Sequence, residues 1–200
     1  DKLKEYTQKI YICGERNSYS KTDHDATFMR MKEDAMKNGQ LKAGYNLQHG
    51  VDSEYIVWLT VSSNPTDTNT LIPFAKGMEN HLKFKYEKFV LDAGYESEEN
   101  YVYLSENEQL SFIKPANYEI SKTRKYQNDI GRIENMEYNE SDDCYICRNN
   151  KKLVASKEYK KKTVTGYESV KTIYTCEDCG GCPHKASCIK GNNCKTPMED

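Results

Sequence analysis

The order of patterned segments between residues 45 and 114 constrains the fold more than any other feature of the sequence. Two neighbouring runs, one alternating and one β-branched and aromatic, predict an antiparallel hairpin, and helical and strand patterns then alternate. The predicted strands cover residues 45–51, 55–61, 88–91 and 110–114, and the predicted helices cover 71–82 and 97–104. The run 88–91 is apolar without alternation, which is typical of a central strand covered on both faces. This succession predicts an α/β fold, in which helices pack on one mixed sheet.

The composition changes near residue 116, where polar, Lys-rich runs of β-like character lead into a group of cysteines. We therefore expect an N-terminal helical or irregular segment over residues 1–40, a core over 41–117, and a basic, β-rich segment over 118–200. Gly14 is expected to end the first helix. No run of about 18 apolar residues is present, so no membrane-spanning helix is predicted.

Asp92 directly follows the apolar run 88–91 and precedes Ala93 and Gly94. The carboxyl end of a central parallel strand is where α/β sheets gather ligands and catalytic groups, so this position favours a functional role for Asp92. The alternative is that Asp92 only caps the loop, with Gly94 supplying the positive φ that a turn needs.

Six segments of the chain together resemble one protein family. They are "SYSKTDHDATFMRMK", "GYNLQHGVDSEYIV", "NPTDTNTLIPF", "LDAGYESEENYVYL", "SFIKPANYE" and "CEDCGGCPHKASC", in this order. Taken together they resemble the DDE transposases of bacterial insertion sequences, whose catalytic domain has an RNase H-like fold. The resemblance extends from about residue 13 to residue 190.

The resemblance implies a catalytic site in which three carboxylates bind two divalent cations, usually magnesium, for cleavage and strand transfer of DNA phosphodiester bonds. Carboxylates suit magnesium because it is a hard cation that prefers oxygen ligands. Asp92 matches the second acid of the family. The resemblance also implies DNA at transposon ends as the partner, and a homodimer that pairs two ends. The DNA substrate and reduced thiols predict a cytoplasmic, DNA-associated location in a bacterium.

The sequence departs from the family pattern at the other two acids. In the family the first lies on a strand before the hairpin, and the third is a glutamate on a helix beyond the cysteines. Asp23 and Asp25 precede the hairpin but lie outside a strand pattern, while Asp52 has the position of a hairpin turn residue and Asp67 that of a helix cap. We therefore expect a central fragment of a transposase, with an incomplete core and an exposed hairpin edge. The alternative function is a catalytically dead DNA-binding remnant.

Seven of the eight cysteines fall between residues 144 and 194, and their C-x-x-C spacing favours metal ligation over disulfides. By resemblance to the recurring family pattern, the preferred zinc ligands are Cys147, Cys179, Cys182 and Cys188. Cys176 is the reserve ligand and His184 a weaker one, with Cys194 beyond them. An iron–sulfur cluster and free or disulfide-forming thiols are the alternatives.

The chain has a net charge of −2 and a pI near 6.2, so its overall charge does not favour nucleic acid. The distribution does, because residues 148–171 hold eight basic side chains against two acidic ones. We expect Lys160, Lys161 and Lys162 to contact DNA from a zinc-stabilised basic lobe, together with Lys114 at the end of the predicted strand before Pro115. The alternative is a solvated charged hairpin.

Overall fold

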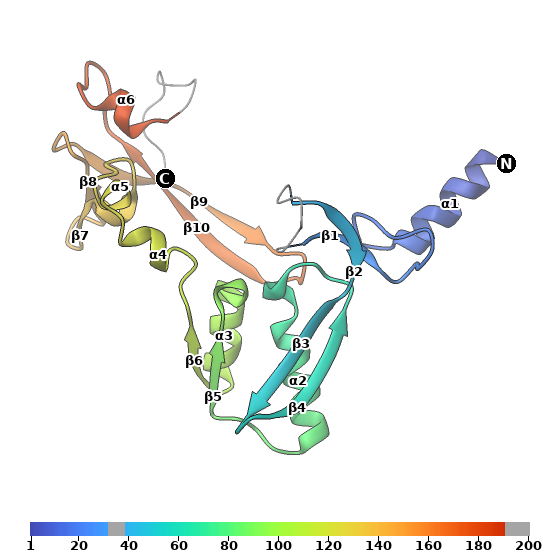
Figure 1. The fold of residues 1–200 in the computed structure, drawn as a ribbon. Helices are drawn as coiled ribbons and strands as arrows, with labels where there is room; N and C mark the ends of the chain where they lie inside the picture. Colours follow the sequence, from blue (N-terminus) through green and yellow to red (C-terminus); the bar gives the residue numbers. More distant parts are fainter. Residues whose placement is uncertain (32–38, 191–200) are drawn as a thin grey trace. The chain divides into compact units, whose positions relative to one another are not determined.

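The computed structural model describes residues 1–31 and 39–190 and divides into two compact units, Asp1–Ala116 and Asn117–Asp200 (Figure 1). Helices and several small sheets together make an α/β protein, which confirms the predicted class. Within the described residues, none of the helices has both the length and the apolar character required to cross a membrane.

The first unit begins with helix α1 (Lys2–Cys13), which ends at Gly14 with a φ of 58°, as predicted. Strand β1 (Thr27–Arg30) pairs antiparallel with β2 (Leu41–Gly44). In the segment between α1 and β1, the Arg16 guanidinium donates hydrogen bonds to the carbonyl oxygens of Ile12, His24 and Asp25.

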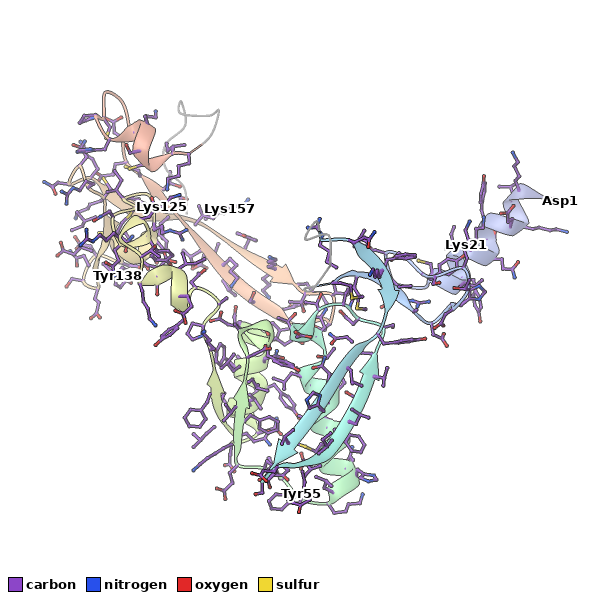
Figure 2. All side chains as sticks on the ribbon, viewed as in Figure 1. Asp1, Lys21, Tyr55, Lys125, Tyr138 and Lys157 are labelled. Carbon is purple, nitrogen blue, oxygen red and sulfur yellow. The ribbon has the colours of Figure 1, made fainter. Side chains whose placement is uncertain are left out.

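The predicted hairpin is confirmed: β3 (Asn46–Asp52) pairs antiparallel with β4 (Tyr55–Ser62). Ser53 and Glu54 form its two-residue turn with positive φ, and Tyr55, labelled in Figure 2, stands beside this turn. The short helix η1 (Asp67–Asn69) leads into α2 (Leu71–Leu82), which buries Leu71, Phe74, Ala75 and Met78 on one side.

The next elements form a parallel βαβ unit, β5 (Lys88–Leu91), α3 (Glu98–Glu106) and β6 (Leu110–Ile113), in which β5 pairs with β6. The short helix η2 (Ala93–Tyr95) follows β5. The Ser97 side chain accepts a hydrogen bond from the Asn100 amide and caps α3, as predicted. Leu104 of α3 is fully buried against Phe89 and the α2 side chains.

Two expectations about this sheet are wrong. Within residues 1–31 and 39–190, β3–β4 and β5–β6 form separate two-stranded sheets, not one mixed sheet. Moreover, β5 is covered on one face only, because Phe89 is 7% exposed while Val90 is 83% exposed. The helical core contacts Phe89, and alternation along the strand turns Val90 to the opposite face.

A cavity of about 270 Å³ lies between the two small sheets. Its lining includes His49 and Val51 of β3, Phe89 of β5, and Phe74 and Met78 of α2. The structure therefore has a slot, lined mainly by apolar side chains, beside strands whose other edges are already paired with β4 and β6.

The second unit contains the short helices α4 (Tyr118–Ser121), α5 (Arg124–Gln127) and η3 (Ile133–Asn135), followed by an antiparallel sheet in the order β7–β8–β9–β10. The strands are β7 (Glu137–Asn139), β8 (Cys144–Ile146), β9 (Lys152–Lys162) and β10 (Glu168–Cys176), and the short helix α6 (Lys185–Cys188) follows. The small core of the second unit contains Leu153 and Cys176, and the rings of Tyr145 and Tyr174 pack edge to face.

Candidate functional site

Asp92 stands where β5 ends. Its Oδ1 accepts a hydrogen bond of 2.7 Å from the Gly94 amide, which holds the carboxylate at the end of the strand. The parallel register pairs Leu91 with Ile113, and the Lys114 amide donates to the Leu91 carbonyl at 3.3 Å. The residues that follow β5 and β6, Asp92 and Lys114, therefore emerge at the same edge of the sheet, and both are exposed.

Asp67 is a second carboxylate at this edge, and its expected role as a helix cap is wrong. The residue at the N-cap of α2 is Thr70. Asp67 Oδ1 instead accepts hydrogen bonds from Asn46 Nδ2 at 2.7 Å and from Gln48 Nε2 at 3.3 Å, both on β3. These two amides orient the Asp67 carboxylate.

Gly94 brings the two carboxylates together. A Cβ placed on Gly94 would lie 2.6 Å from Asp67 Oδ2 and 3.0 Å from Asp92 Oδ1. Both oxygens therefore border the same small space, and their separation cannot exceed the sum of these distances. The positive φ considered for Gly94 is absent, since the described glycines with positive φ are Gly14, Gly39, Gly166 and Gly181. Glycine fits here because the Asp67 side chain occupies the place of a Cβ.

Buried polar side chains hold the turn that carries Asp67 and the turn that carries Asp92 in place. Gln48 is only 3% exposed, and its Oε1 accepts a hydrogen bond from the Tyr95 hydroxyl. Burial, and after it the negative charges of Asp67 and Asp92, raise the pKa of Tyr95 to about 12, so this hydroxyl stays protonated as a donor. The fully buried Asn100 amide donates to the carbonyl oxygens of Thr68 at 3.0 Å and Tyr95 at 2.8 Å.

This pair of carboxylates suits a hard divalent cation. Magnesium is commonly held by one or two carboxylates, with water and substrate phosphate completing its coordination. Asp67 and Asp92 supply such oxygens at an edge where Asp92 is open to solvent. In the part of the chain that the structure describes, no group of three or more His, Cys, Asp or Glu side chains is placed to hold a metal ion. By themselves, these two carboxylates could supply only part of the ligands that a bound cation needs.

The strand pattern pointed to Asp92 but not to Asp67. The proximity of Asp67 to Asp92 depends on a contact with Gly94, which is distant from Asp67 in sequence. No spacing rule connects the two positions. Of the other acids weighed from the sequence, Asp23 accepts a hydrogen bond from the Tyr45 hydroxyl and Asp52 accepts one from the Tyr86 hydroxyl.

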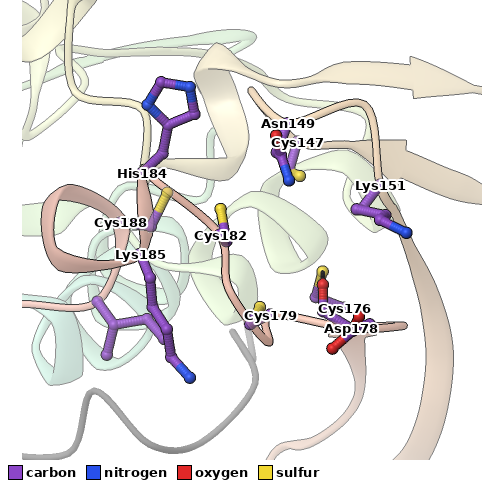
Figure 3. A pocket seen from close by; sticks show the side chains of 11 residues that line it. Cys147, Asn149, Lys151, Cys176, Asp178, Cys179, Cys182, His184, Lys185 and Cys188 are labelled. Carbon is purple, nitrogen blue, oxygen red and sulfur yellow. Dashed lines mark hydrogen bonds between the residues drawn. The ribbon is translucent and has the colours of Figure 1, made fainter.

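The second unit gathers cysteines around one small pocket with a volume of about 20 Å³ (Figure 3). Cys147 follows β8, Cys176 ends β10, and Cys188 ends α6. The cysteines that line the pocket are Cys147, Cys176, Cys179, Cys182 and Cys188, and His184 lies beside them. Buried Cys144 does not line this pocket, and Cys194 falls outside the described residues.

The thiols of this pocket are free of disulfide bonds. The seven described cysteines form no disulfide among themselves. Burial, followed by a hydrogen bond with Cys179, raises the pKa of Cys176 to about 12, and burial also raises the pKa of Cys188. The structure thus brings the five cysteines to one pocket, but the described side chains do not form a metal-binding group.

The lysines predicted to contact DNA are exposed. Lys160, Lys161 and Lys162 end β9, and Lys162 Nζ lies 3.4 Å from Glu168 Oε1 across the ribbon. Lys114 belongs to the first unit.

Comparison with known proteins gives one match. A family model described as the transposase DDE domain matches residues 16–192, which include parts of both units. Neither a curated protein nor a solved structure matches the chain. Because the family model covers well over half of the 200 residues, the chain belongs to the transposase DDE domain family.

Proposed function

We propose that this chain takes part in metal-dependent cleavage and strand transfer of DNA phosphodiester bonds during transposition. Its family acts on DNA in transposition and generally uses a divalent cation such as Mg²⁺. The observation that carries the proposal is the placement of Asp92 at the carboxyl end of β5 with the Asp67 carboxylate beside it.

Asp92 and Asp67 would hold the cation in this proposal. When bound, the cation activates the attacking hydroxyl and stabilises the leaving oxygen. The Asn46 and Gln48 amides orient Asp67, and Asn100 fastens the two turns that carry the acids. Two carboxylates held close together repel each other, so the site favours a cation between them. Lys114, at the same edge, would attract the DNA phosphate.

We infer an RNase H-like arrangement with room for one more strand. The β3–β4 hairpin and the parallel β5–β6 pair flank the slot, and an extended segment there would pair with both inner edges. A strand parallel to β5 would end at the edge that carries Asp92. This is where the family resemblance expects the first acid.

The first experiment measures Mn²⁺ binding by electron paramagnetic resonance, with Mn²⁺ standing for Mg²⁺. Asp92→Asn and Asp67→Asn should each weaken binding, since each removes a charged oxygen ligand. Asp52→Asn is the matched control, because Asp52 lies at the turn end of β3 and is hydrogen-bonded to Tyr86. Equal binding by the Asp92 and Asp67 variants and the unsubstituted chain would reject the site.

DNA binding without cleavage is the second candidate function. It is favoured by the absence of any group of three metal-ligating side chains within residues 1–31 and 39–190. Incubation with plasmid DNA and Mg²⁺ separates the two: cleavage that Asp92→Asn abolishes supports the first function. Binding without cleavage, together with unchanged Mn²⁺ affinity in the Asp92 variant, supports the second.

For the cysteine pocket we propose structural zinc, supported by five cysteines around one small space. Zinc binding would have to draw the thiols closer together, because the described side chains do not present a complete ligand set. Zinc would bind the cysteines as thiolates, so its binding would release protons. Elemental analysis of purified protein tests this. About one zinc per chain, lost in Cys179→Ser together with stability, supports the site, and metal-free folded protein rejects it.

Assembly as a homodimer and a cytoplasmic, DNA-associated location stay predictions of the family resemblance. Light scattering with and without DNA tests the first of them.

A further inference from the structure

Strands β9 and β10 form a long two-stranded ribbon. β8 pairs only with residues 152–154 of β9, so from Ala155 onward β9 pairs with β10 alone among the described strands. The pairing continues to Lys162 and Glu168 at the turn end. Figure 1 shows the two strands side by side, and Lys157 is labelled on this ribbon in Figure 2.

The two faces of the ribbon differ in charge. Directly paired residues share a face and successive residues alternate, so the register assigns each side chain. The basic face carries Lys157, Tyr159, Lys161, Ser169, Lys171 and Ile173. The mixed face carries Glu158, Lys160, Lys162, Glu168, Val170 and Thr172. The six residues of the basic face thus include three lysines and no aspartate or glutamate, whereas those of the mixed face include two lysines and two glutamates.

The run of consecutive lysines is therefore divided by the strand. Lys160 and Lys162 lie on the mixed face, where Lys162 pairs with Glu168 at 3.4 Å, while Lys161 lies on the basic face. Lys157 and Lys171, both exposed, join Lys161 there although they are distant from it in sequence.

We propose that the basic face of the β9–β10 ribbon is a docking surface for the phosphate backbone of duplex DNA. The inference rests on the proposed function only in taking DNA as the partner, and it adds which face of the lobe meets it. The occupant is a duplex because the major groove of B-DNA admits a two-stranded β-ribbon.

The spacing of the lysines fits a groove. At about 3.4 Å per residue, Lys157 and Lys161 stand about 14 Å apart along β9. The major groove is about 12 Å wide, so the two ammonium groups reach phosphates on its opposite sides. Between them, Tyr159 and Lys171 are directly paired and face the groove. Contacts of this kind are independent of base sequence.

The test compares two double variants that remove equal charge from the same strand: Lys157→Gln/Lys161→Gln on the basic face and Lys160→Gln/Lys162→Gln on the mixed face. All four side chains are exposed, and circular dichroism checks that both variants fold. Affinity for a fluorescent mixed-sequence duplex is measured by anisotropy over a series of KCl concentrations.

Loss of two phosphate contacts should make the slope of log affinity against log salt less negative by about 1.8 in the basic-face variant. A fourfold rise in salt then weakens this variant about tenfold less than the unsubstituted chain. The mixed-face variant should keep the original slope. A third substitution, Lys171→Gln, should reduce the slope by about a further 0.9.

Equal slope changes in the two double variants, or a larger change in the mixed-face variant, would overturn the proposal. An unsubstituted chain that does not bind the duplex would overturn it as well. Mn²⁺ binding at Asp92 is measured separately on the same proteins, so a failure of this surface is distinguishable from a failure of the carboxylate site.

Discussion

Replacing Gly94 with alanine tests whether Asp67 and Asp92 act as a pair. The new Cβ would lie 2.6 Å from Asp67 Oδ2 and 3.0 Å from Asp92 Oδ1, whereas ordinary contact begins at 3.4 Å. Either the Asp67 carboxylate moves away or the turn that carries Asp92 opens. Both responses separate the carboxylates, and neither removes a charge.

The hydrogen bonds of the site set the size of the effect. If Asp67 moves, its Oδ1 loses or lengthens the bonds from Asn46 and Gln48. If the turn opens, Asp92 loses its bond from the Gly94 amide. A hydrogen bond to a charged group contributes about 1.5–3 kcal/mol, so the free energy of unfolding should fall by up to this amount. Disturbing the support of a metal ligand typically weakens metal binding about 10- to 100-fold, and we expect a loss of this size for Mn²⁺.

The assay combines Mn²⁺ titration with urea unfolding. Gly50→Ala is the matched control, because its Cβ would lie 3.1 Å from the Phe74 ring, with no carboxylate among its nearest contacts. The control should lose stability but keep Mn²⁺ affinity once folded. If Gly94→Ala binds Mn²⁺ as tightly as the unsubstituted chain, the two carboxylates do not share a cation.

Three further predictions concern stability and chemistry. Leu104→Ala should destabilise the first unit by about 2–5 kcal/mol in urea unfolding, since Leu104 is fully buried and its truncation leaves a cavity. Asp143 accepts hydrogen bonds from the hydroxyls of Tyr174 and Tyr138, and these bonds lower the pKa of its carboxyl group. The contribution of Asp143 to folding stability is therefore fully present above the ordinary carboxyl pKa and is lost as the pH falls through the lowered pKa. Asp143→Asn should therefore make the stability of the second unit depend less on pH in the acid range, as measured by thermal unfolding at several pH values. An unchanged pH dependence would contradict this. Asp92→Asn in a cleavage-competent transposase should abolish strand cleavage but leave DNA binding intact in a gel-shift assay.

Local patterns in the sequence predicted the elements between residues 46 and 113 well, because hydrophobic periodicity and helix capping are local. They did not predict strands β1 and β2, since residues 1–40 were expected to be helical or irregular. The β3–β4 hairpin, α2, β5 and the Ser97 cap of α3 are all present. Periodicity did not predict the separation into two small sheets, since an apolar run such as Val90 and its neighbours does not reveal which partner strands are present. The environment of Asp67 depends on tertiary contacts with β3 and Gly94, which lie beyond the reach of local patterns.

The open slot connects the fold to the site, because β5 carries Asp92 at its end and borders the slot along its length. Amides of β5 that point to β6 are hydrogen-bonded in the parallel ladder, while those on the slot edge have no strand partner among the described residues. Hydrogen exchange should therefore be slow at alternate residues of β5 and fast at the others. Strand addition in the slot would slow the fast set and fix the end of β5. By linkage it would raise the cation affinity by the same factor by which the cation raises affinity for the strand. Uniform protection along β5 in the chain alone would show that the slot edge is already paired, and this coupling would then be absent.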